Sequence, residues 1–115
     1  MRTVQEVFNH HVQALNEANL DEVAYDYAEQ AFFITKDDGV VRGREAIKKW
    51  FGGVLFGPLA GAKFDATTLI VEGDIVYLEW KAEATANNAS GVDTFVIHDG
   101  QIQAHTVKVL SLAPK

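Results

Sequence analysis

The stretch GVDTFVIHDGQIQAHT, residues 91–106, decides the fold predicted for this sequence. Its first half is rich in β-branched and aromatic residues, and its second half alternates between apolar and polar residues, as half-buried strands do. Between the halves, Asp99 and Gly100 form the Asp-Gly pair that favours a type I′ turn. We therefore predict a hairpin of two antiparallel strands. These paired strands carry one carboxylate, Asp93, and one imidazole, His105.

Upstream of this hairpin, the sequence predicts helices first and strands afterwards. The expected elements, in order, are a helix from Thr3, a helix over 19–28, strands over 31–35 and 40–42, a helix over 44–51, strands over 63–71 and 75–86, and the hairpin strands over 92–98 and 101–110. Residues 87–91 are expected to form a polar turn. The apolar, glycine-rich residues 52–61 should end the third helix and then either pack on the core or cover the mouth of a cavity. This order predicts an α+β fold in which one curved, mostly antiparallel sheet surrounds the helices.

Helical spacing separates the two neighbouring histidines of the first helix. At about 100° per residue, His11 falls on the apolar face, whereas His10 points away from it and should lie in solvent. His11 is therefore either a core histidine that bonds to the protein or a residue of a cavity, and both interpretations stay open. Tyr27, placed on the buried side of the second helix, is more typical of a core residue than of a catalyst.

The strand over 75–86 has two chemically different faces. One face carries Val76, Leu78 and Trp80, and the other carries Tyr77, Glu79, Lys81 and Glu83. One face should meet the core, and the other should meet a partner subunit or a wet cavity. We expect a homodimer through the sheet face, because an apolar strand face left in water invites aggregation.

Size and composition indicate one domain, 1–115. Hydrophobic residues make up 48% and charged residues 23% of the chain, which is typical of soluble globular proteins. The net charge of −6, without a cluster of lysines or arginines, argues against a nucleic-acid partner. The chain has no cysteine, no apolar leader at its N-terminus and no apolar segment long enough to cross a membrane. We expect a cytoplasmic protein without a membrane partner.

Six motifs follow one another along nearly the whole chain. They are Ala14-Leu15-Asn16, Asn19-Leu20-Asp21, Tyr27-Ala28-Glu29, GVVRGREAI (39–47), VEGDIVYLEW (71–80) and GVDTFVIHDGQI (91–102). Together they resemble the nuclear-transport-factor-2-like superfamily, which includes ketosteroid isomerases, SnoaL-like polyketide cyclases and limonene epoxide hydrolases. The resemblance implies a cone-shaped, cystatin-like fold in which three N-terminal helices pack on a curved sheet. It says less about function, because this fold hosts many chemistries.

The resemblance to ketosteroid isomerases implies a set of candidate site residues. His11 stands where that family has a tyrosine that donates a hydrogen bond to the substrate oxyanion, and Asp93 stands where it has a neutral carboxylic acid. Thr35 replaces the general base of the family, and a threonine hydroxyl cannot shuttle protons near neutral pH as a carboxylate does. Classical steroid isomerisation is therefore not expected. His105 and Glu79 join the set because they lie at the parity that faces the cavity in the family, and SnoaL-like cyclases are understood to use an aspartate with a histidine.

The resulting hypothesis is a SnoaL-like or ketosteroid-isomerase-like enzyme for a small, hydrophobic carbonyl or polyketide-type compound, working by acid/base chemistry without a cofactor. Asp93 and His11 would transfer the proton or polarise the oxygen, and His105 would assist. The expected ligand-binding residues are Thr35, Tyr27, Phe33, Trp50, Phe51, Glu79 and Phe95. The spacing of the four histidines does not match a metal site. The alternative hypothesis is a non-catalytic ligand-binding or dimerisation domain, in which His11 and Asp93 would form a structural hydrogen bond.

Overall fold

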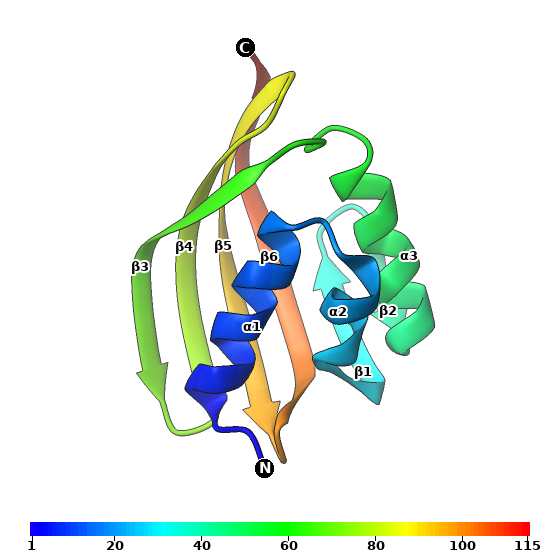
Figure 1. The fold of residues 1–115 in the computed structure, drawn as a ribbon, viewed down its shortest axis with the longest axis vertical. Helices are drawn as coiled ribbons and strands as arrows, with labels where there is room; N and C mark the ends of the chain where they lie inside the picture. The colour runs from blue at the N-terminus through cyan, green and yellow to red at the C-terminus, as the bar shows by residue number, and fades with distance from the viewer.

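The computed structural model describes all residues, 1–115, and shows three helices packed against one curved sheet (Figure 1). The elements are α1 (Val4–Asn16), α2 (Leu20–Tyr25), β1 (Tyr27–Thr35), β2 (Gly39–Arg42), α3 (Arg44–Leu55), β3 (Lys63–Glu72), β4 (Ile75–Glu83), β5 (Asn87–His98) and β6 (Gln101–Pro114). The strand order in the sheet is β2-β1-β6-β5-β4-β3. The pair β1–β6 is parallel and all other pairs are antiparallel. The predicted α+β fold with a curved, mostly antiparallel sheet is confirmed.

The hairpin of β5 and β6 forms at the predicted place. Asp99 and Gly100 have φ angles of 53° and 72°, the positive values that a type I′ turn requires at both positions. Every second side chain of β5 from Ala89 to Ile97 is buried, so one face of this strand looks at the helices. β5 also extends back to Asn87, and the predicted polar turn over 87–91 is wrong. Pairing with the long neighbours β4 and β6 overrides the weak strand preference of asparagine and glycine.

Two helix ends differ from the prediction. α2 ends at Tyr25, and Tyr27 is the first residue of β1 instead of the last turn of a helix. The backbone N–H of Ile102 donates to the carbonyl of Asp26 at 2.7 Å, so pairing with β6 begins directly after the helix. α3 continues through two glycines to Leu55, although a break at residue 52 was predicted. The cost of glycine in a helix is small compared with the burial of Leu55, which lies on the same stripe as Ile47 and Phe51.

The core lies between the helices and the concave face of the sheet. α1 begins at the predicted capping box, in which Thr3 Oγ1 accepts from the N–H of Glu6 and the Glu6 carboxylate accepts from the N–H of Thr3. The buried residues of α1 are Val7, Phe8, His11 and Ala14. On β4 the core side is the parity of Val76, Leu78 and Trp80, which are all buried. No helix of the structure combines the length and the apolar character that crossing a bilayer requires.

Candidate functional site

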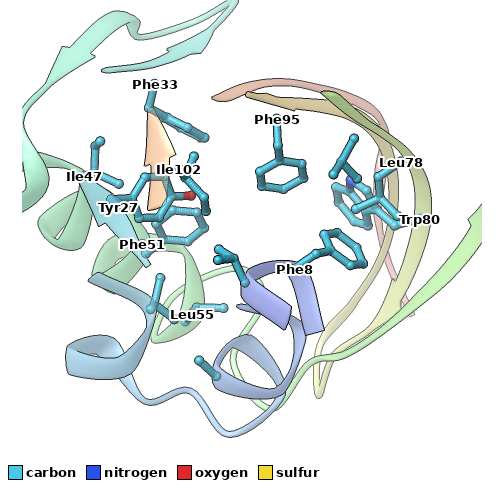
Figure 2. Packing of buried hydrophobic residues seen from close by; sticks show 14 of the residues in the cluster. Phe8, Tyr27, Phe33, Ile47, Phe51, Leu55, Leu78, Trp80, Phe95 and Ile102 are labelled. Carbon is cyan, nitrogen blue, oxygen red and sulfur yellow. The ribbon is translucent and has the colours of Figure 1, made fainter. Parts of the chain in front are cut away.

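An apolar cavity of about 170 Å³ lies between the helices and the concave face of the sheet. Hydrophobic residues make up 18 of the 23 residues that line it. Phe8, Phe33, Phe51 and Phe95 point toward this space from α1, β1, α3 and β5 (Figure 2). Its exposed rim consists of Pro58, Asp65, Ala66, Val109 and Leu112, at the end of the sheet where β3 begins and β6 ends. An engineered apolar cavity of about 150 Å³ is enough to hold benzene, so this cavity has room for a small organic ligand.

The structure brings most of the predicted site residues to this cavity. Those that line it are His11, Phe33, Trp50, Phe51, Asp93, Phe95 and His105. Tyr27, Thr35 and Glu79 are not part of its wall. The titratable side chains of the wall therefore come from α1, β5 and β6, together with the rim residue Asp65.

The Asp93 carboxylate is held by two side chains. The indole N–H of Trp80 donates to Oδ1 at 2.8 Å, and Nε2 of His105 lies 2.7 Å from Oδ2. The sheet register explains this cluster, because Asp93 pairs with Leu78 on β4 and with Val107 on β6. Trp80 and His105 are each two residues along from these paired positions, so their side chains lie on the same face as Asp93 and diagonally next to it. An ionised carboxylate has about four acceptor positions, so each oxygen keeps one that a ligand could use.

The protonation of His105 follows from its second partner. The Tyr27 hydroxyl lies 2.8 Å from Nδ1 of His105. Burial raises the pKa of Tyr27 well above its usual value, so the phenol keeps its proton and donates a hydrogen bond to Nδ1. The neutral imidazole then carries its proton on Nε2, and this N–H donates a hydrogen bond to Asp93. Burial also lowers the pKa of His105, against the opposing effect of Asp93, which favours this neutral ring near pH 7.

His11 is not the partner of Asp93. Its ring packs edge-on against Tyr27, Phe51 and Phe95 at centroid distances of 5.5, 6.0 and 5.5 Å. Neither ring nitrogen has a hydrogen-bond partner, although the residue is only 1% exposed. The structural hydrogen bond between His11 and Asp93 that the alternative hypothesis assumed is absent, and His105 takes that place.

A second buried carboxylate, Asp26, lies behind His11. Arg2 Nη1 donates to Oδ1 of Asp26 at 2.7 Å, and Nδ1 of His10 lies 2.7 Å from the same oxygen. Nδ1 of His11 is 3.5 Å from Oδ2. Burial by itself would raise the pKa of Asp26, but the groups of His11, Arg2 and His10 outweigh it and hold the pKa below its usual value. The expectation that His10 lies in solvent is wrong, because Asp26 draws its ring into a half-buried pair.

The remaining predicted residues lie outside the cavity. Glu79 was expected on the cavity side, but it points to the outer face of β4, where Tyr77 donates a hydrogen bond to it at 2.7 Å. The reason is the alternation of the strand, which turns Glu79 outward because Trp80 is turned inward. Thr35 Oγ1 accepts from the N–H of Asp38 at 2.9 Å and stays in that turn. Tyr27 is not part of the wall but contacts two of its residues, through a hydrogen bond to His105 and edge-on packing against His11.

Sequence reasoning missed two residues of this site, Trp80 and Asp26. Trp80 was placed on a strand face without a role, and only its alternation with Glu79 indicated that it points inward. Asp26 carried no signal, since it was expected within a helix. The structure contains no group of three or more His, Cys, Asp or Glu side chains placed to hold a metal ion.

Comparison with known proteins places this geometry in context. A model of the SnoaL-like domain family matches residues 8–105. No curated protein matches the chain. Among solved structures, SalBIII, described as an epoxide hydrolase/cyclase-like enzyme in pyran ring formation of the polyether salinomycin, superposes with a TM-score of 0.84 at 19% identity, over 97% of this chain and 95% of that one.

Two further structures show the same fold. IdmH from Streptomyces antibioticus, described as a proposed polyketide cyclase, has a TM-score of 0.83 at 14% identity, over 95% of this chain and 93% of that one. A proposed ketosteroid isomerase from Kribbella flavida has a TM-score of 0.80 at 15% identity, over 94% of this chain and 78% of that one. At these identities the similarity shows the fold alone.

Proposed function

The chain belongs to the SnoaL-like domain family, and from that premise we propose that its cavity carries out cofactor-free acid/base chemistry, as an isomerase or cyclase of a small hydrophobic carbonyl compound. The observation that supports this most is the Asp93 carboxylate in a mostly apolar wall, oriented by Trp80 and His105. A carboxylate fixed in this way can take a proton from a carbon next to a carbonyl group and return it elsewhere. His11, whose nitrogens have no partner in the protein, is the second group able to bind or move a proton of the ligand.

The residues that line the cavity also favour a neutral ligand over an anionic one. No lysine or arginine lines it, and Asp65 and Asp93 contribute carboxylates. An anionic ligand would lose its hydration without gaining a counter-charge, whereas a neutral ligand buries apolar surface at little electrostatic cost. The volume of about 170 Å³ fits one ring, with a longer ligand extending past the rim.

Substitution of Asp93 tests the proposal. A panel of neutral cyclic ketones is incubated with the protein in D₂O, and deuterium uptake next to the carbonyl is followed by NMR. We expect the wild-type protein to exchange at least one of these ketones faster than buffer does. Asp93→Asn should lower that rate by about 10²–10⁴-fold, the usual contribution of a positioned acid/base group.

Glu79→Gln provides the matched control, because it makes the same change from carboxylate to amide on the outer face of the sheet. It should exchange at the wild-type rate. An Asp93→Asn protein that exchanges as fast as the wild type would remove Asp93 from the mechanism. A ketone that binds in the cavity without any exchange would favour a ligand-binding domain.

A second copy of the chain is the partner proposed for the outer face of the sheet. Ile70 and Ile75 are 57% and 42% exposed there, and Tyr77 stands beside Ile70 in the register of β3 and β4. Burying these side chains in a two-fold interface would remove apolar surface from water. We expect the mass of a dimer in light scattering after gel filtration. A monomer at all concentrations up to the millimolar range would contradict this.

A further inference from the structure

The group around Asp26 is larger than a structural ion pair needs to be. Asp26 is 0% exposed, and an ionised carboxylate at such a place is stable only when donors compensate it. Arg2 supplies a charge and also donates to the carbonyl of Gly100 at 3.0 Å, which ties the N-terminus to the turn between β5 and β6. His10 supplies a second donor at 2.7 Å. These two residues supply the short hydrogen bonds of Asp26, and Nδ1 of His11 approaches the same carboxylate at the longer distance of 3.5 Å.

His11 has the opposite problem, since it is buried without a hydrogen bond. An unsatisfied buried polar group is unfavourable, and such a group in a native fold calls for an explanation. The ring lines the cavity, and its Nδ1 faces Oδ2 of Asp26 at 3.5 Å. The negative charge of Asp26 favours a proton on that nitrogen. Nε2 is then left as an acceptor without any partner in the protein.

We propose that Asp26 is the positioning residue of His11: it keeps the proton of the neutral ring on Nδ1 and thereby presents Nε2 as an acceptor to a hydroxyl or enol group of the ligand. The role in turnover rests on the proposed function of the cavity. When the proton is transferred, the ligand O–H bond breaks and an Nε2–H bond forms. The positive ring then lies beside the Asp26 carboxylate, and the ligand holds the negative charge until the proton returns. No other reactant is needed.

The two histidines of the cavity consequently differ in tautomer. Their ring centroids are 6.1 Å apart. His105 accepts a hydrogen bond from the Tyr27 hydroxyl at Nδ1 and carries its own proton on Nε2. His11 has Nδ1 toward Asp26 and, on this proposal, carries its proton there. The titratable groups around His11 are Asp26 and His10 on its outer side and Tyr27 and His105 on its cavity side, with Arg2 and Asp93 one contact further on. The cavity therefore presents two sets of hydrogen-bond acceptors, the Asp93 oxygens and Nε2 of His11. These acceptors suit a neutral ligand that carries a hydrogen-bond donor.

Histidine tautomers in the ¹⁵N-labelled wild-type protein test the inference without any substrate. Long-range ¹H–¹⁵N correlation at about pH 8 distinguishes Nδ1–H from Nε2–H rings, and single histidine variants assign the signals. We expect Nδ1–H for His11 and Nε2–H for His105. In Asp26→Asn the amide no longer favours a proton on the facing nitrogen, and the Nε2–H form of His11 should become the major one.

Asp74→Asn is the matched control, because Asp74 pairs at 3.0 Å with the exposed His98. It should leave the His11 signals unchanged. Phenol, a one-ring donor, should shift the Nε2 signal of His11, and anisole, which lacks the donor, should not.

An Nε2–H ring at position 11 of the wild-type protein would overturn the inference, and so would an unchanged tautomer in folded Asp26→Asn. If Asp26→Asn does not fold, the tautomer of His11 in the wild-type spectrum still tests the inference. Failure of the proposed function looks different: the tautomers and the phenol response would be as expected, and no ketone would exchange deuterium.

Discussion

At the scale of the residue, the geometry of Asp93 depends on a glycine that has no chemistry of its own. Gly91 pairs with Trp80 across β4 and β5. A Cβ atom at Gly91 would lie 2.4 Å from Cζ2 of Trp80 and 2.9 Å from the carbonyl oxygen of Lys108. The missing side chain lets the indole lie flat on the strand, and this position aims its N–H at Asp93.

We predict that Gly91→Ala displaces Trp80 and weakens its hydrogen bond to Asp93. Overpacking of this kind costs about 1–3 kcal/mol, because neither the strand backbone nor the indole can move freely. Urea unfolding measures the loss of stability, and the indole ¹H–¹⁵N signal of Trp80 should move upfield as its hydrogen bond lengthens. An unchanged indole signal would show that the ring does not depend on Gly91.

At the scale of the element, α3 shows how burial extends a helix beyond its local preferences. Ile47, Phe51 and Leu55 lie four residues apart on one stripe, and each is buried. The stripe continues through Gly52 and Gly53, which lower the stability of a helix without preventing it. The extra turn brings Val54 and Leu55 to the cavity wall. Residues 52–55, which the sequence predicts to lie beyond the end of the helix, therefore help to form the cavity.

We predict that Gly53→Ala stabilises the protein by about 0.5–1 kcal/mol, the usual difference between the two residues in a helix interior. The position is exposed, and a Cβ there would have no atom within 4 Å. The midpoint of urea unfolding should rise while its slope stays the same. Gly53→Ala is also the control for Gly91→Ala, since the same added methyl group should have effects of opposite sign at the two positions.

At the scale of the whole molecule, two buried ionisable groups couple stability to pH in different windows. Burial lowers the pKa of His105 in the folded protein below its usual 6.5, the pKa expected in the unfolded chain. At pH values between these two pKa values, the unfolded chain binds a proton at His105 that the folded chain does not. Stability then falls as the pH falls. Asp26 has a pKa below its usual 3.8, and its contribution is lost only as the pH falls further, through that lower value.

We predict that the free energy of unfolding decreases when the pH is lowered from 7.5 through 6.5, with a second loss below 3.8. His105→Gln should remove most of the first decrease while lowering stability at pH 7.5, because the hydrogen bonds of the ring are weakened. Urea unfolding at half-unit steps of pH measures both effects. A wild-type profile that is flat between pH 7.5 and 5 would contradict the role given to His105.

The architecture, including the hairpin, could be predicted from local patterns. The Asp-Gly turn, the capping box at Thr3 and the alternation of the last strands each depend on residues only a few positions apart. These patterns identified the hairpin, with Asp93 and His105 on its paired strands, and the α+β order. The resemblance of six short motifs added the family and, with it, the expectation that Asp93 and His105 face the cavity.

Which groups meet one another was decided only by the tertiary structure. The hydrogen bonds of the site join positions 13, 24 and 78 residues apart, as in Trp80–Asp93, Arg2–Asp26 and Tyr27–His105. Such contacts depend on strand register, on the bulges in β5 and β6, and on where α2 ends, and no pattern within a short window specifies these. The sequence therefore predicted Asp93, His105 and His11 as site residues. The tertiary structure determined that Asp93 pairs with His105 and that His11 faces Asp26.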